Sequence, residues 1–125
     1  MEPINLPEIV AEVEEALERY EDALVNNRVE ILDELVWTAP QTVRYGAGET
    51  LYGIDEIRAF RSSRPATGLA RTILRTQITT FGRDFAVAHR VFSRPNNPKP
   101  GRQTQTWVRT EAGWKVVSAH VSQQI

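Results

Sequence analysis

The stretch Gly101–Ser122, GRQTQTWVRTEAGWKVVSAHVS, decides the fold class of this chain. It combines period-2 alternation with β-branched and aromatic residues, which is typical of strands. Gly113 lies where the alternation is interrupted, and glycine adopts the positive φ of a tight turn without steric cost. The stretch is therefore predicted to form a β-hairpin. One face of its second strand is expected to mix apolar and polar residues, as a pocket wall does: Trp114, Val116, Ser118, His120 and Ser122.

In the part of the chain that precedes this hairpin, the sequence predicts helices first and long strands afterwards. Apolar residues at helical spacing predict a long helix over Pro7–Asn26, a short helix over Val29–Leu35 and a third helix over Ile54–Arg61. Two short strands are expected at Thr42–Tyr45 and Thr50–Gly53, on either side of a turn that contains glycine.

Two further long strands precede the hairpin. The alternating stretches Arg71–Phe81 and Asp84–Arg94 are separated by a gap of hairpin size. Pro95–Pro100 is predicted to be a loop, because proline and asparagine dominate it. Helices followed by an antiparallel meander are typical of an α+β fold, in which the helices pack on the concave face of one bent antiparallel sheet. We therefore expect residues 1–125 to form a single cone-shaped domain with a pocket at its wide end.

The composition of the chain excludes several kinds of site. The 125 residues contain no cysteine, which rules out disulfides and thiolate ligands, and two histidines, which leave little material for a transition-metal site. No apolar run approaches the length of a membrane span, and the N-terminus is acidic rather than basic and then apolar. We therefore expect a cytoplasmic protein that uses no metal or other cofactor and binds no membrane.

Charge is distributed unevenly along the chain, although the net charge is only −1. Residues 1–40 carry eleven acidic and two basic side chains, a balance of −9, whereas residues 41–125 carry five acidic and thirteen basic ones, a balance of +8. An acidic helical layer on a basic sheet explains this pattern, and so does a basic pocket for a small anion. Nucleic acid is disfavoured as a partner, because no basic stripe with interleaved aromatic residues is present.

Three stretches carry a resemblance to a known family: ERYEDALVNNRVEILDELVW (18–37), VRYGAGETLYGIDEIRAFRSSRP (43–65) and the hairpin sequence itself. Together with the element order, they make the chain resemble the NTF2-like (SnoaL-like) superfamily, and within it the AtzH-like family, also known as HpxZ or DUF3225. This family includes proteins of oxalurate catabolism and of cyanuric acid breakdown. The resemblance covers nearly the whole chain and implies the cone-shaped NTF2-like fold, assembled as a homodimer.

The resemblance also implies a chemistry and two catalytic residues. For the characterised branch of the family, it implies decarboxylating amide hydrolysis of a dicarboxylated urea without a metal. The catalytic residues implied for that branch are a tyrosine of the first helix and an arginine of the first short strand. The matching residues in this chain are Tyr20 and Arg44. Isomerase relatives have an acidic general base where this chain has Arg44, so proton abstraction of the isomerase type is disfavoured.

The positions of these residues fit such roles, with ordinary packing as the alternative. Tyr20 lies on the apolar stripe of the first helix, where it could relay a proton or only pack its ring. An inward Arg44 would offer a planar fork that binds a carboxylate and stabilises a developing oxyanion, whereas surface arginines are commoner. Further candidates for binding substrate at the pocket wall, otherwise core or dimer residues, are Trp37, Gln105, Trp107, His120 and Ser122.

The remaining arginines are expected away from the pocket. Arg58, Arg61 and Arg64 are assigned to a solvated helix face, and Arg71 and Arg75 to a dimer surface. The outer face of the sheet is the expected homodimer interface, because apolar and aromatic residues occupy both parities of the long strands.

Three functions remain open from the sequence. The leading one is a metal-free decarboxylating amidohydrolase that acts on a small carboxylated urea or ureide in nitrogen catabolism. The second is a non-catalytic accessory protein that binds a small anion or an amidase of the same pathway. The third is a dimeric scaffold whose cavity is filled by side chains. The family fold hosts both the enzyme and the accessory protein, so the fold alone cannot decide between them.

Overall fold

The computed structural model describes residues 2–124, which form three helices and one six-stranded sheet. The helices are α1 (Pro7–Val25), α2 (Val29–Leu35) and α3 (Ile54–Ser63). The strands are β1 (Val43–Tyr45), β2 (Thr50–Tyr52), β3 (Thr72–Phe81), β4 (Phe85–Arg94), β5 (Asn97–Thr110) and β6 (Gly113–Gln123). Their order across the sheet is β2-β1-β6-β5-β4-β3. The predicted α+β class and the bent sheet are confirmed, and the four long strands are antiparallel.

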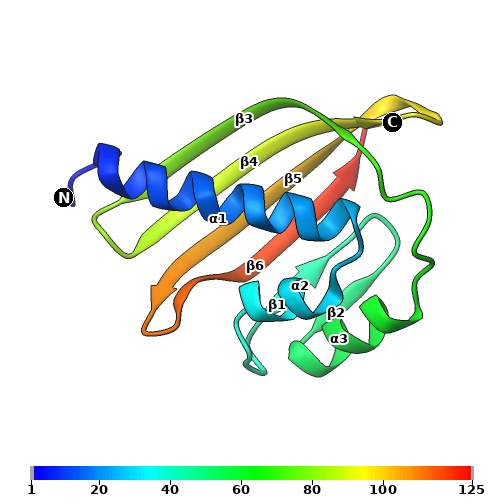
Figure 1. The fold of residues 1–125 in the computed structure, drawn as a ribbon, viewed down its shortest axis with the longest axis horizontal. Helices are drawn as coiled ribbons and strands as arrows, with labels where there is room; N and C mark the ends of the chain where they lie inside the picture. Colours follow the sequence, from blue (N-terminus) through cyan, green and yellow to red (C-terminus); the bar gives the residue numbers. More distant parts are fainter. Residues whose placement is uncertain (1, 125) are drawn as a thin grey trace.

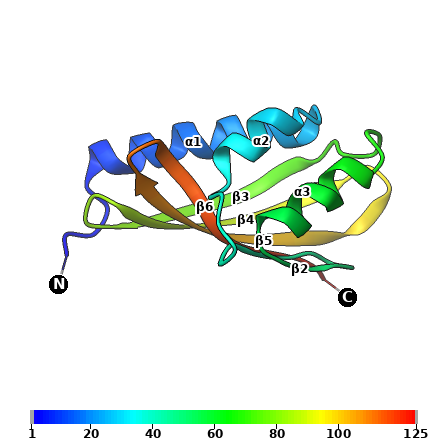
Figure 2. The same cartoon turned by 90° about the horizontal axis from the view of Figure 1, so that it is seen from below.

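Helix α1 lies across one face of the sheet, with α2 and α3 on the same side near one end (Figures 1 and 2). Pro7 begins the helix, where its missing N–H costs no hydrogen bond, and Asn27 follows its end with a φ of 50°. Its buried stripe has helical spacing and consists of Ile9, Val13, Leu17, Tyr20, Ala23 and Leu24. This stripe forms the core together with inward residues of β4, β5 and β6.

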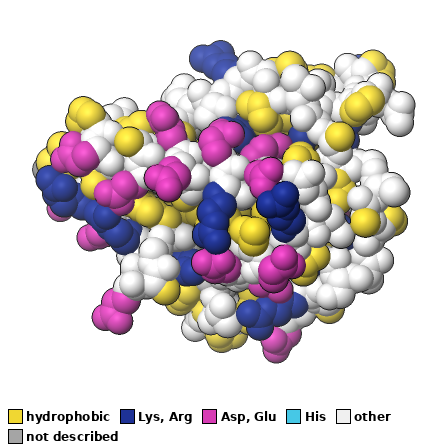
Figure 3. Space-filling model, in the orientation of Figure 1, with side chains coloured by type: hydrophobic (Ala, Val, Ile, Leu, Met, Phe, Trp, Pro, Cys, Tyr) yellow, Lys and Arg dark blue, Asp and Glu magenta, His cyan; other side chains and the backbone are white. Residues whose placement is uncertain are grey.

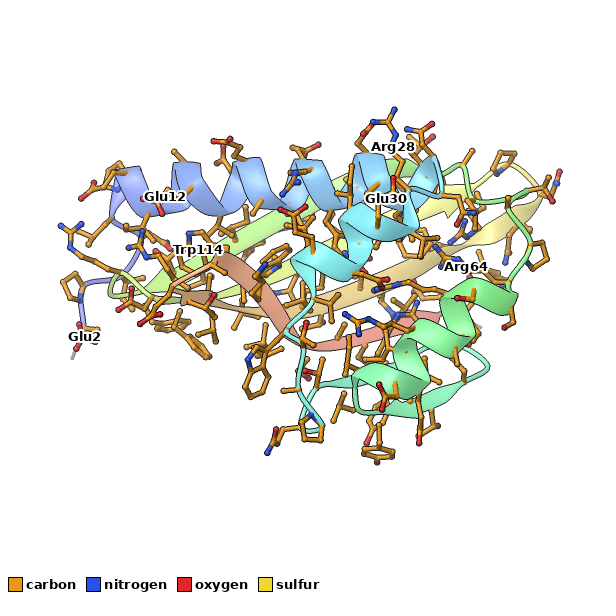
Figure 4. The ribbon with its side chains drawn as sticks, turned by 60° about the horizontal axis from the view of Figure 1, so that its bottom comes forward. Glu2, Glu12, Arg28, Glu30, Arg64 and Trp114 are labelled. Carbon is orange, nitrogen blue, oxygen red and sulfur yellow. The ribbon has the colours of Figure 1, made fainter. Side chains whose placement is uncertain are left out.

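The opposite face of α1 is acidic, and Figure 3 shows its carboxylates gathered over the helix. Several of them reach basic or polar groups on the sheet. Glu12 accepts hydrogen bonds from Trp114 Nε1 at 2.9 Å and from Arg109 Nη1 at 2.5 Å, and Figure 4 shows Glu12 and Trp114 on neighbouring elements at one end of the cone. Hydrogen bonds and ion pairs therefore attach the acidic helix to a basic sheet, as the charge distribution suggested.

A β-bulge in β6 changes which of its residues face the core. Trp107 pairs with Val116, but the preceding residue of β5, Thr106, pairs with Ser118, so Val117 is extra. Beyond the bulge, Ser118 and His120 are exposed and Ala119 is buried. The expectation that Ser118, His120 and Ser122 share a face with Trp114 and Val116 is therefore wrong, because one inserted residue reverses the alternation.

Strand β1 pairs in parallel with β6 and antiparallel with β2. Arg44 is paired with Ala119 on one side and with Leu51 on the other, and both partners are buried. Residues that are directly paired across a sheet project from the same face, so Arg44 points inward. The bulge and this pairing together place Arg44 beneath the helices.

The predicted loop Pro95–Pro100 is much shorter than expected. Only Pro95 and Asn96 form the turn, because Arg94 already pairs with Asn97. The prolines that follow fall between this pair and the pair Phe92–Gly101, where three residues of β5 lie opposite one of β4. Proline is tolerated there because the hydrogen-bond ladder is already interrupted. Within residues 2–124, the structure has no helix that is both long and apolar enough to span a membrane.

A substitution at Gly101 is expected to destabilise the fold. A Cβ at this position would lie 2.3 Å from Cζ of Phe92, a residue that is 2% exposed and whose ring packs against the guanidinium groups of Arg71 and Arg94. Gly101→Ala should lower the free energy of unfolding by about 1–3 kcal/mol, measured by urea denaturation. Gly48→Ala is the matched control, because nothing lies within 4 Å of its added Cβ. Equal stability of the two variants would contradict this account of the β4–β5 packing.

The homodimer remains a prediction, and the outer face of the sheet is more polar than the sequence suggested. The exposed residues of this face on the long strands include Gln77, His89 and Thr104, whereas Leu74, which is 57% exposed, lies at the bulge of β3. Light scattering at micromolar concentration should give twice the mass of one chain, because the helices leave this face uncovered (Figure 2). The mass of a single chain would refute the dimer.

Candidate functional site

A small cavity lies between the C-terminal half of α1, the sheet and the end of α3. Its volume is about 50 Å³, which is room for a group of a few heavy atoms. Four arginines contribute to its wall, namely Arg44, Arg64, Arg71 and Arg94. Among the described residues, none of the side chains that line it is acidic. The cavity is therefore a cationic compartment inside a protein that is nearly neutral overall.

Tyr20 projects from the buried stripe of α1 into this compartment and is 4% exposed. Its ring packs edge to face on Trp107, with 6.1 Å between the ring centres. Burial alone would raise the pKa of the phenol, but the positive charges of Arg61, Arg44 and Arg71 and hydrogen bonding from Arg61 outweigh it. The net result is a pKa below the ordinary value of 10.0. Tyr20 is thus a stronger acid than a free tyrosine, and its anion is stabilised in place.

Three of the arginines around Tyr20 are held by carboxylates. Arg71 donates to both oxygens of Glu21, at 2.8 and 2.6 Å. Arg61 pairs with Asp33 at 3.1 Å. Arg44 donates from Nη1 to Glu49 at 2.6 Å, and its side chain is 15% exposed. These pairs fix the guanidinium groups in position without placing a carboxylate in the cavity wall.

Two further arginines of the wall have no carboxylate partner within the part of the chain that the structure describes. Arg94 donates to the carbonyl oxygens of Gly68 and Leu69, at 3.3 and 3.2 Å. The Nε and Nη2 atoms of Arg64 are buried and have no hydrogen-bond partner among residues 2–124. Burial, followed by the charges of Arg61 and Arg44, lowers the pKa of Arg64 below its ordinary range. The arginines of the wall therefore carry more positive charge than the carboxylates paired with them neutralise.

The structure brings together only some of the residues that the sequence analysis selected. Tyr20, Arg44 and Gln105 line the cavity. Trp107 is fully buried beneath them and donates from Nε1 to the Gln105 side-chain oxygen at 3.1 Å. It supports the wall rather than forming it.

The other three selected residues lie elsewhere. Trp37 is 36% exposed after the end of α2 and does not line the cavity. His120 and Ser122 follow the bulge and belong to the outward-facing parity of β6. The ring of His120 instead packs edge to face on Tyr45, at 5.6 Å between centres. The structure therefore corrects the placement of Trp37, His120 and Ser122 as pocket-wall residues.

Most of the cationic wall was missed by sequence reasoning. Arg61 and Arg64 were assigned to a solvated face, yet Arg61 is 4% exposed. A signal was available, because Arg61 follows Ile54 and Ile57 at the spacing of one buried helix face. Arg71 was assigned to the dimer surface, yet its side chain is 1% exposed and stacks 4.3 Å above the Phe92 ring. The +8 balance of residues 41–125 was the one global indication of this wall.

A comparison with protein families matches residues 2–125 to the family described as AtzH-like. The chain belongs to the AtzH-like family. A comparison of this AtzH-like protein with curated proteins finds no match. Its fold is that of the NTF2-like superfamily, as the sequence predicted.

Solved structures of similar chains agree with this assignment. A DUF3225-family protein of unknown function from Pectobacterium atrosepticum is 53% identical, with 98% of this chain and 95% of that chain covered and a TM-score of 0.96. A cystatin-like fold protein from Burkholderia xenovorans is 44% identical, with 98% and 97% covered and a TM-score of 0.94. An NTF2-like protein of unknown function from Pseudomonas putida is 18% identical, with 90% and 84% covered and a TM-score of 0.73, and this likeness shows the fold alone.

The lowered pKa of Tyr20 predicts a specific pH dependence of stability. Between that pKa and 10.0, the native state has lost the phenol proton and the unfolded state still holds it, so stability rises with pH. Below the lowered pKa the contribution is lost. The difference in unfolding free energy between the parent and Tyr20→Phe should therefore increase in favour of the parent across this window. Urea unfolding at several pH values measures it, and a difference independent of pH would contradict the lowered pKa.

Proposed function

We propose that this AtzH-like protein is a decarboxylating amidohydrolase that acts on a small carboxylated urea or ureide in nitrogen catabolism. One observation carries the proposal: Tyr20 and Arg44 line the same cationic cavity. These are the two residues that the family resemblance selects as catalytic. The wall has arginines and amides but no acid among the described residues, which suits an anionic substrate with carbonyl groups.

In this proposal, Tyr20 is the acid of the reaction. A carboxylated urea loses its terminal carboxylate when the C–N bond breaks, the electron pair stays on nitrogen, and nitrogen takes the proton of Tyr20. The carbon leaves as carbon dioxide, water returns a proton to Tyr20, and the hydroxide that remains converts carbon dioxide to bicarbonate. The lowered pKa of Tyr20 supports this role, because the surrounding arginines stabilise the tyrosinate that forms.

Arg44 binds and orients the substrate in the same proposal. Its guanidinium has five N–H donors in a planar fork, and the ion pair with Glu49 engages Nη1. Phe60 lies against the group, with 5.6 Å from Cζ to the ring centre, and limits its movement. A carboxylate held at Arg44 would lie in the same small compartment as the Tyr20 phenol, which is the proximity that proton transfer requires.

The accessory function remains the alternative, and the small size of the cavity favours it. A volume of about 50 Å³ accommodates a carboxylate-sized group more readily than a whole ureide. A screen of carboxylated ureas and ureides, with detection of carbon dioxide and ammonia, separates the two. Turnover supports the enzyme, whereas binding of small carboxylates without turnover of any ureide supports a binding protein.

Substitution of the two proposed residues should separate binding from chemistry. Tyr20→Phe removes only a hydroxyl, so it should lower kcat about 10²- to 10⁴-fold while KM changes little. Arg44→Lys keeps the charge and loses the fork, so it should raise KM about tenfold or more. The measurement is steady-state kinetics on whichever ureide the screen identifies.

Matched controls make this test specific. Tyr52→Phe removes the hydroxyl of an exposed tyrosine, and Arg58→Lys alters an arginine whose side chain is 45% exposed. Both controls should retain the kinetics of the parent. Well-folded Tyr20→Phe and Arg44→Lys variants that turn over the substrate like the parent would defeat the assignment.

A further inference from the structure

The cavity wall contains buried donors whose hydrogen bonds are not satisfied by the described residues. They are Nε and Nη2 of Arg64 and Nε2 of Gln103, and both side chains line the cavity. The unsatisfied buried acceptors of the described residues, on Asn27 and Thr80, do not line it. Buried donors without partners are costly and therefore uncommon in folded proteins. The cavity therefore lacks hydrogen-bond acceptors for these donors.

The orientation of the Gln103 amide is fixed by its neighbour. Arg71 Nη2 donates to Gln103 Oε1 at 2.9 Å. Because a guanidinium has donors only, the amide oxygen must face Arg71, and the amide nitrogen must face away from it. Gln103 is 3% exposed, so bulk water does not reach that nitrogen. It is therefore a positioned donor.

Arg64 is held in place by the end of α3. It is the C-cap residue of that helix, its backbone N–H bonds to the carbonyl oxygen of Phe60, and Pro65 ends the helix after it. Figure 4 shows Arg64 where α3 approaches the sheet. The backbone of Arg64 is thus fixed, whereas its guanidinium makes no ion pair among the described residues, in contrast to Arg44, Arg61 and Arg71.

The neighbouring carboxylates already serve other arginines. Glu21 accepts from Arg71 and Arg90, Asp33 pairs with Arg61, and Glu49 pairs with Arg44. Turning any of them toward Arg64 would leave another buried or half-buried guanidinium without its partner. An acceptor for Arg64 and Gln103 must therefore come from outside these residues.

We propose that Arg64 and Gln103 form a second anion-binding subsite, and that Arg64 is a substrate-binding residue which distinguishes ligands with two anionic groups from ligands with one. Arg44 binds one group and the Arg64–Gln103 pair binds the other. The inference rests on the proposed function for the identity of the substrate, but the subsite itself is defined by the orphaned donors. Water could satisfy these donors as well, but water would not select between anions.

Isothermal calorimetry with malonate and acetate as probes tests the subsite directly. The parent protein should bind malonate more tightly than acetate. Arg64→Gln should weaken malonate binding about 10- to 100-fold, because charge-assisted hydrogen bonds are lost, and should remove the preference for malonate. Arg58→Gln removes a charge from the exposed face of the same helix and should keep both affinities. An unchanged malonate-to-acetate ratio in Arg64→Gln would overturn the proposal, and so would equal affinity of the parent for both probes.

The stability of the variant provides a second test, because replacing an arginine that only supports the fold would destabilise the protein. Arg64→Gln should unfold at the same or a higher urea concentration than the parent, because it removes a half-buried cation that has no acid partner among the described residues. Lower stability of Arg64→Gln than of the parent would mean that Arg64 stabilises the fold, and it would count against the subsite. Arg64→Lys, which keeps the charge without the fork, should restore only part of the malonate preference.

The outcome also separates this inference from the proposed function. If ureides are turned over and Arg64→Gln has the KM of the parent, the subsite is wrong and the enzyme stands. If no ureide is turned over and the malonate preference depends on Arg64, the enzyme is wrong and the subsite stands.

Discussion

The rest of the site depends on the contacts of the half-buried carboxylate of Glu21. It accepts from Arg71 at 2.6 and 2.8 Å and lies 3.5 Å from Arg90, so one acid of α1 neutralises two buried guanidinium groups of the sheet. Removing one partner of such a pair strands the other in a medium of low dielectric constant, which typically costs 3–5 kcal/mol. The helix is thereby attached to Arg71, just before β3, and to Arg90 of β4, at the level of Tyr20, one residue before Glu21.

The charge asymmetry of the sequence becomes intelligible from this contact. At one end of α1, Glu8 and Glu12 meet Arg83 and Arg109 on the sheet, so charges there are matched. Toward the other end, acids of the helices satisfy Arg71 and Arg61, and the wall still contains Arg64 and Arg94 without carboxylates among the described residues. The excess positive charge thus gathers where the cone is hollow. The mutual repulsion of these cations favours a nearby negative charge, and it lowers the pKa of Tyr20 for the same reason.

The sequence predicted where the helices and strands lie far better than which of their residues face the core. Val29–Leu35 was predicted with its observed bounds, because a short amphipathic repeat flanked by breakers leaves little choice. The bulge at Val117 could not be foreseen, since one extra residue in an alternating strand leaves no mark in the sequence and appears only through pairing with β5. His120 and Ser122 were misplaced for that reason. Tyr20 and Arg44 came from a family resemblance, whereas Arg61 needed only its helical phase with Ile57 to be placed inward.

The ion pair between Arg44 and Glu49 has a consequence for any anion that reaches this arginine. Glu49 returns to Arg44 across the β1–β2 turn, and Gly46 leaves room for it, because a Cβ there would lie 1.7 Å from the Glu49 carboxylate. An incoming anion that needs the same N–H groups therefore exchanges with a tethered one instead of entering an empty position. Under the proposed function, the tethered Glu49 acts as a high local concentration of competitor, which displaces an anion that binds only Arg44 more readily than one that also binds a second group. If Arg44 binds an anion as proposed, the four-residue connection between β1 and β2 therefore selects for anions that make more than one contact.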